Sequence, residues 1–218
     1  MTTSTLLSGP HSASGSKTFA TPAPDERIER TASALAAKGF IVEILDDVAA
    51  VRARISELLP PNAAVFTAAS ETLRLAGIDD DINASGRYAA VKPRIHALDR
   101  TSHSAEIRRL TATPDVVVGS VSALTEDGAL VAVSASGSQL PAYAGGAACV
   151  IWVIGAQKIV ADLDTAFRRV ESYALPLEDA RARAIYDRSS AINKVLIVNA
   201  EPVPGRATVL LVRQAIGF

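Results

Sequence analysis

Residues 115–158 read DVVVGSVSALTEDGALVAVSASGSQLPAYAGGAACVIWVIGAQK in one-letter code and contain three apolar runs separated by polar turns. The runs 115–119 and 149–154 are apolar on both faces of the strands that they predict, as in parallel sheets covered from two sides. The run between them carries the turn residues Glu126-Asp-Gly128 and predicts a β-hairpin near 121–133. This stretch therefore predicts a sheet that is mostly parallel, with some antiparallel pairing.

Helical and strand patterns alternate on both sides of this stretch. Helices are predicted over 25–38, 47–58, 70–77, 101–110, 162–173 and, after Pro176, 177–188. Strands are predicted over 40–45, 63–67, 88–91, 194–199 and 207–212. Such alternation is typical of βαβ units, so the sequence predicts an α/β fold with helices on both faces of a mostly parallel sheet.

The domain organisation follows from composition. Residues 1–24 are mostly Ser, Thr, Gly and Pro, lack the basic start and apolar core of a signal peptide, and predict a disordered tail. Residues 25–218 are long enough for one domain with a full core. We find neither an internal repeat nor a boundary that marks a second domain.

Charge and cysteine content exclude nucleic-acid and membrane partners and an internal disulfide. Lys and Arg number 22 and Asp and Glu 23, a net charge of −1, and no basic block occurs, so neither nucleic acid nor a membrane surface is an expected partner. The uncharged run 128–156 is interrupted by serines, glycines and Pro141 and is predicted to be buried sheet. The single cysteine, Cys149, excludes an internal disulfide; we expect it to be buried, and the protein to be cytoplasmic.

The turn Ser134-Ala-Ser-Gly-Ser-Gln139 is the first candidate site. It follows a predicted strand and precedes a predicted helix start, and Gly137 lets the backbone turn with positive φ. Ser134, Gly137, Ser138 and Gln139 could then hold a phosphate or carboxylate on backbone amides. The alternative is an ordinary tight turn.

A second candidate follows the most apolar strand, where Gly155-Ala-Gln-Lys158 begins. Ligands of open α/β sheets bind beyond the carboxyl ends of the strands, so Gly155 and Lys158 are placed to reach that crevice. The alternative is a lysine that extends to solvent along the next helix. Glu126 is the nearest candidate for a catalytic acid, base or nucleophile, and its alternative is a solvated turn.

Other catalytic signatures are missing from the sequence. The three histidines, His11, His96 and His103, lie in polar surroundings without cysteines or acids at metal-ligand spacing, so no metal site is predicted. The chain has no dinucleotide-binding glycine motif after a strand, no phosphate-binding Walker loop and no Gly-x-Ser-x-Gly elbow. No cofactor is therefore predicted.

Ordered motifs from residue 115 onward resemble the LUD-domain family, the lactate-utilisation proteins of LutC type. The resemblance rests on Val121-Ser-Ala-Leu-Thr-Glu-Asp-Gly128, Ala135-Ser-Gly-Ser-Gln-Leu140, Gly155-Ala-Gln-Lys-Ile-Val160, the helix 162–169 and the ending 205–218. It implies a NagB/RpiA/CoA-transferase-like fold. It also implies a part in L-lactate oxidation to pyruvate, beside separate iron–sulfur subunits.

Three functional hypotheses follow. The first is a lactate-utilisation protein that binds a small anionic or phosphate-bearing metabolite. The second is an isomerase or acyl-CoA-transferase-like enzyme with Glu126 as base or nucleophile, so whether the chain is an enzyme stays open. The third is a non-catalytic partner of an iron–sulfur lactate oxidoreductase. A homo-oligomer is compatible with each of them.

Overall fold

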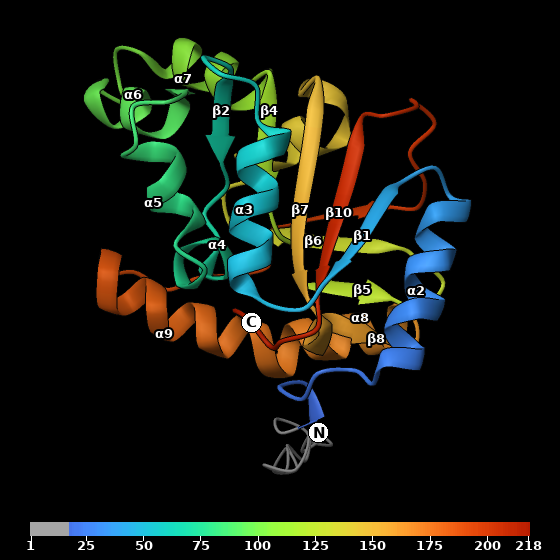
Figure 1. The fold of residues 1–218 in the computed structure, drawn as a ribbon. Coiled ribbons are helices and arrows are strands. Elements are labelled where there is room, and N and C mark those ends of the chain that lie inside the picture. Colours follow the sequence, from blue (N-terminus) through green and yellow to red (C-terminus); the bar gives the residue numbers. More distant parts are fainter. Residues whose placement is uncertain (1–17) are drawn as a thin grey trace, which may run out of the picture.

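The computed structural model describes residues 18–218, and its centre is a six-stranded sheet whose strands are all parallel (Figure 1). In spatial order the strands are β1 (Ile41–Leu45), β10 (Ala207–Val212), β7 (Cys149–Gly155), β4 (Val116–Gly119), β2 (Ala64–Thr67) and β3 (Ala89–Ala90). The apolar runs at 115–119 and 149–154 form the two neighbouring central strands β4 and β7. The predicted α/β class with a mostly parallel sheet is confirmed.

A second, smaller sheet packs against the first. Its order is β8 (Ile159–Val160), β5 (Ala123–Thr125), β6 (Leu130–Ser134) and β9 (Lys194–Val198). Strands β5 and β6 are antiparallel and confirm the hairpin near 121–133. Gly128 turns this hairpin with a φ of +89°, which favours glycine, and a Cβ there would make a tight contact of 3.1 Å with the Leu35 backbone nitrogen.

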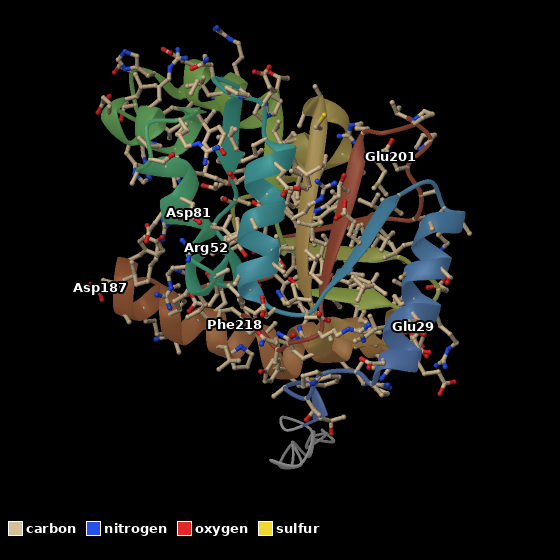
Figure 2. All side chains as sticks on the ribbon, in the orientation of Figure 1. Glu29, Arg52, Asp81, Asp187, Glu201 and Phe218 are labelled. Atoms are coloured by element: carbon tan, nitrogen blue, oxygen red, sulfur yellow. The ribbon has the colours of Figure 1, made fainter. Side chains whose placement is uncertain are left out.

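One face of the main sheet is covered by helices α3 (Val48–Leu58), α4 (Glu71–Leu75) and α5 (Ile78–Asn83). Val51 and Ile55 of α3 pack with Val118 and Val153 of the central strands in one apolar cluster. On the outer surface of this layer Figure 2 labels Arg52 on α3 and Asp81 on α5, which form an ion pair.

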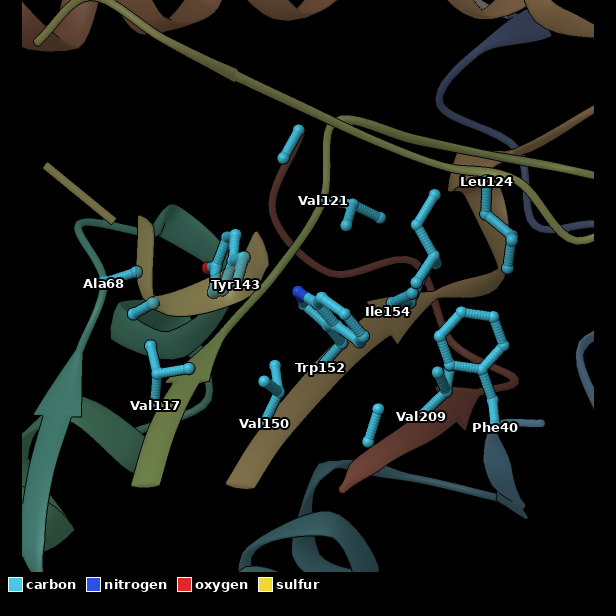
Figure 3. Close-up of a cluster of buried hydrophobic side chains, with 14 of the residues drawn as sticks. Phe40, Ala68, Val117, Val121, Leu124, Tyr143, Val150, Trp152, Ile154 and Val209 are labelled. Carbon is cyan, nitrogen blue, oxygen red and sulfur yellow. The ribbon is translucent and has the colours of Figure 1, made fainter. Parts of the chain in front are cut away.

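The opposite face is covered by the second sheet, by α2 (Asp25–Ala37) and by the π-helical turn η1 (Ala142–Gly146). Trp152 of β7 lies at the centre of this cluster (Figure 3). Its ring meets Phe40 and Tyr143 in edge-to-face contacts, with centroids 6.0 and 5.5 Å apart. Both faces of the central strands β4 and β7 are thus buried, which explains why these two strands are apolar.

The remaining helices are α6 (Val91–Ala97), α7 (Ser104–Ala112), α8 (Leu163–Arg169) and α9 (Leu175–Tyr186). We expected separate helices on either side of Pro176, but the π-helical turn η3 (Val170–Ala174) joins α8 to α9 without a break in the backbone. Pro176 lies in the first turn of α9, where a missing N–H disrupts no bond within that helix. Among residues 18–218, no helix is long and apolar enough to cross a bilayer.

Two expectations need correction or restriction. Cys149, expected to be buried, is exposed, because it is the first residue of β7 and burial begins at Val150. Residues 1–17 of the expected tail lie outside the described residues, whereas residues 18–24 pack on the domain. The N–H of Ala23 donates to the Ala156 carbonyl at 3.2 Å, and the Phe19 ring lies 6.3 Å from that of Tyr173.

Candidate functional site

The topology of the main sheet points to one part of its carboxyl edge. From β2 the chain continues outward to β3, whereas from β4 it passes through β5 and β6 of the second sheet and returns on the opposite side of β4, as β7. In open α/β sheets, the crevice at such a switch in direction is where ligands bind. Here helix α4, which follows β2, carries Thr72, the residue after β4 is Ser120, and the segment that follows β7 carries Gln157 and Lys158.

Lys158 occupies the centre of this edge and points into the protein. Its side chain is 2% exposed, and its Nζ donates to Thr72 Oγ1 at 2.8 Å, Ser120 Oγ at 3.0 Å and the Val121 carbonyl at 3.0 Å. The two hydroxyls donate in turn to backbone carbonyls, Thr72 to Ile216 at 3.3 Å and Ser120 to Val153 at 2.7 Å. Lys158 therefore connects the segments that follow β2, β4 and β7.

Two opposing effects act on the charge of Lys158. Burial, and after it the positive charge of Arg169, lower the pKa of Lys158 well below its ordinary value. Against this, the hydroxyls of Thr72 and Ser120 donate their own hydrogen bonds to carbonyls. All three oxygens around Nζ therefore accept from it, which matches the three N–H donors of an ammonium. The hydrogen-bond pattern is therefore that of a charged lysine.

Arg169 of α8 is a second buried cation nearby. Its guanidinium donates to the carbonyls of Gln157 at 3.4 Å, Phe19 at 3.5 Å and Ser122, and it lies 5.1 Å from the centroid of the Tyr173 ring. Burial lowers the pKa of Arg169 to about 10, so the side chain stays protonated at neutral pH. No carboxylate of residues 18–218 forms an ion pair with either Lys158 or Arg169.

A pocket of about 490 Å³, which we call the Gln157 pocket, is lined by two residues whose carbonyls accept from Arg169. One wall comes from Gln157, Ile159 and Thr165, and the other from residues 18–24, with Arg27 at its side. Gln157 and Phe19 both line the pocket, and their backbone carbonyls both accept hydrogen bonds from Arg169. The guanidinium of Arg169 therefore lies behind the two walls.

Gln157 is itself buried, and only one end of its amide is bonded. Its Nε2 donates to the carbonyls of Ile216 at 2.9 Å and Gly217 at 3.1 Å, whereas its Oε1 has no hydrogen-bond partner. A Cβ on Gly155 would lie 2.2 Å from that Oε1, so glycine at this position leaves room for the amide. An unpaired buried acceptor of this kind can receive a donor from a ligand or a water.

The turn at 134–139 lies elsewhere, at the end of β6. Gly137 has the expected positive φ, +81°, but its N–H donates to Ser134 Oγ at 2.8 Å, and the Ser138 N–H donates to Ser136 Oγ at 3.4 Å. Ser134 and Ser138 also donate to Gln139 Oε1. The turn thus satisfies two of its amides internally, and no hydrogen bond joins it to Lys158 in the described part of the chain.

Glu126 lies at the opposite end of β6 from that turn. Its carboxylate pairs with Arg27 at 2.6 Å and Arg30 at 3.2 Å, and its N–H donates to the Val160 carbonyl. Arg27 and Val160 both line the Gln157 pocket. The structure therefore places Glu126 next to the pocket beside Lys158, and it leaves Ser134, Gly137, Ser138 and Gln139 apart from them.

Sequence reasoning missed Thr72, Ser120, Gln157, Arg27 and Arg169. For Thr72 and Ser120 a signal was present, because both closely follow predicted strands. For Arg169 the signal was an arginine between Ala166 and Val170, on the apolar stripe of its helix. For Arg27 and Gln157 we find no such signal in the sequence. Residues 18–218 contain no cluster of three His, Cys, Asp or Glu that could hold a metal ion.

Comparison with known proteins agrees with this architecture. The family model of the LUD domain matches residues 28–212. The crystal structure of a DUF162 family protein from Deinococcus radiodurans is similar, with a TM-score of 0.53 and 14% identity, covering 86% of this chain and 96% of that one. At this identity the likeness concerns the fold alone. A search of curated proteins finds no match.

Proposed function

Because the chain belongs to the LUD domain family, we propose that it serves lactate utilisation by binding a small organic anion in the Gln157 pocket. The family supports the process, and the pocket supports the class of ligand. A volume of about 490 Å³ suits a small metabolite, including a hydroxy acid, a keto acid or a phosphate-bearing compound.

The observation that carries this proposal is the pair of buried cations without acidic partners. A buried charge is unfavourable unless an opposite charge or hydrogen bonds compensate it, and Lys158 and Arg169 have only neutral acceptors. Arg169 bonds to the carbonyls of two residues that line the pocket, so its field extends into that space. An anion in the pocket would lower the electrostatic energy of both cations.

Gln157 supplies the proposed selectivity. Its Oε1 is buried and unpaired; a ligand hydroxyl that reaches it could donate to it, whereas a carbonyl oxygen could not bond to it. A ligand with an α-hydroxyl, such as lactate, should therefore bind more tightly than its keto counterpart, pyruvate. Lactate is the reduced member of this pair, so the preference would match a protein whose ligand is lactate.

The proposal is tested at Thr165, which lines the pocket in the first turn of α8. Thr165→Glu introduces a carboxylate where a helix start tolerates one, and Thr165→Gln is its neutral control of nearly equal size. Calorimetric titration with L-lactate, pyruvate, a sugar phosphate and a CoA ester should show binding that Glu at position 165 weakens at least tenfold and Gln preserves. Equal affinities in the two variants, or no binding of any of the four compounds, would refute it.

The turn at 134–139 stays a separate proposed anion site, with Lys194 as its cation. Lys194 Nζ donates to the Ser136 carbonyl at 2.8 Å and lies over Gly137. Lys194→Ala separates the two sites in the same titrations. Affinity that falls with this change, and not with Thr165→Glu, would assign the anion to the turn.

A further inference from the structure

A second pocket, which we call the Tyr88 pocket, lies on the outer side of the α3–α5 layer. Its volume is about 430 Å³. Five residues of α3 line it, and three of them, Ala49, Ala53 and Ser56, are short and recur at helical spacing, so that the helix is recessed there. The pocket shares no lining residue with the Gln157 pocket, from which the main sheet separates it.

The base of the Tyr88 pocket is apolar. Ile55, Ile78 and Ile82 line it, and all three belong to the buried cluster between the helices and the main sheet. The half-buried ring of Tyr88 packs against the same cluster. An apolar ligand body would therefore replace water over hydrophobic side chains.

The rim carries two arginines that differ in their partners. Arg52 is neutralised, because its guanidinium makes two bonds of 2.7 Å to the two carboxylate oxygens of Asp81 (Figure 2). Arg87 donates to Ser56 Oγ at 3.0 Å and lies 5.5 Å from the Tyr88 ring centroid, and it pairs with no carboxylate of residues 18–218. The lining thus has one uncompensated positive charge.

We propose that the Tyr88 pocket binds a monocarboxylate with an aromatic or branched apolar body. One free guanidinium fits one carboxylate, which it can hold through two parallel N–H bonds. The hydroxyls of Ser56 and Ser85 lie on the same rim and can donate to the same group. The apolar body then lies over Ile78, Ile82 and the Tyr88 ring.

Methyl NMR on the full chain with labelled isoleucines tests this proposal directly. Titration with phenylacetate should shift the Ile55, Ile78 and Ile82 methyl signals and leave Ile159, in the Gln157 pocket, unchanged. Benzyl alcohol, which lacks the charge, and acetate, which lacks the ring, should each bind at least tenfold more weakly. Shifts confined to Ile159, no shifts at all, or acetate binding as tightly as phenylacetate would overturn the assignment.

Two variants and a control complete the test. Arg87→Gln removes the charge and should weaken phenylacetate binding roughly 10- to 100-fold, the range for a hydrogen bond to a charged group. Ala53→Leu fills the recess from an exposed helix position and should abolish binding without lowering the melting temperature. Arg108→Gln, on exposed α7, should bind like the unchanged protein. Unaltered affinity in either of the first two variants would refute the proposal.

Discussion

The hydrogen bond from Lys158 to Thr72 is the interaction at the carboxyl edge whose energy can be measured most directly. Thr72→Val keeps the shape of the side chain but removes the hydroxyl that accepts from Nζ at 2.8 Å. The variant leaves one N–H of a buried ammonium without an acceptor. A hydrogen bond to a charged group contributes roughly 1.5–3 kcal/mol, so we expect a loss of that size in the free energy of unfolding. For a chain of this length this corresponds to a fall in Tm of roughly 3–12 °C.

A double-mutant cycle separates this bond from the packing of the residue. In a Lys158→Met background the charge is absent, so Thr72→Val should cost less than half as much as in the unchanged chain. Thr72→Ser, which keeps the hydroxyl and loses one methyl, should cost at most about 1 kcal/mol in both backgrounds. The assay is urea unfolding followed by circular dichroism. An equal cost of Thr72→Val with and without Lys158 would show that the proposed bond contributes nothing.

The pH dependence gives an independent check of the same interaction. Because the pKa of Lys158 is lowered in the folded state, the unfolded chain binds more protons between that pKa and the ordinary lysine value of about 10.4, and stability from this group rises with pH through that window. The missing acceptor in Thr72→Val matters only while Lys158 is charged. The stability difference between Thr72→Val and Thr72→Ser should therefore shrink as pH rises through the window.

Three further outcomes are expected. Gly155→Ala places a Cβ 2.2 Å from the Gln157 amide oxygen and should cost roughly 1–3 kcal/mol in thermal unfolding. Gly205→Ala meets no atom within 4 Å and should cost only the strain of its positive φ, about 1 kcal/mol. Equal losses in the two variants would contradict the crowding at Gly155. Glu126→Gln loses two partly exposed ion pairs, each less than about 1 kcal/mol, and should retain anion binding in calorimetry; loss of binding would give Glu126 a direct role. Glu201→Gln removes the carboxylate that pairs with the buried guanidinium of Arg206 and leaves this cation with neutral acceptors only, which should cost roughly 3–5 kcal/mol in urea unfolding. A loss below about 1 kcal/mol would count against that ion pair.

The strands of the main sheet could be predicted because their signal is local. An uninterrupted apolar run such as 149–154 records burial on both faces, which is a property of the strand itself. The assignment of strands to sheets is not local in this sense. The strand predicted at 194–199 was correct, but its place beside β6 in the second sheet depends on residues 60 to 68 positions earlier. The prediction that Cys149 is buried was wrong for a related reason, because the point along a strand where burial begins depends on the elements that pack against it.

The candidate site shows the same division between what is local and what is not. The sequence places Lys158 beyond the carboxyl end of a central strand, and the structure has it there. Whether such a lysine faces solvent, a ligand or the core depends on the acceptors that surround it. Here those acceptors come from Thr72 and Ser120, 86 and 38 positions away, which no pattern around Lys158 records.

The inward direction of Lys158 changes the kind of contribution that it can make. A lysine with all three donors occupied by Thr72, Ser120 and Val121 has no N–H left for a ligand, so its effect on an anion next to Gln157 is electrostatic. Arg169 acts in the same way, from behind carbonyls that line the pocket. Under the proposed function, charge fixed behind the walls would attract any small anion of suitable size but would distinguish poorly among anions. Selectivity must then come from groups that line the pocket, and under the proposed function Gln157 supplies it.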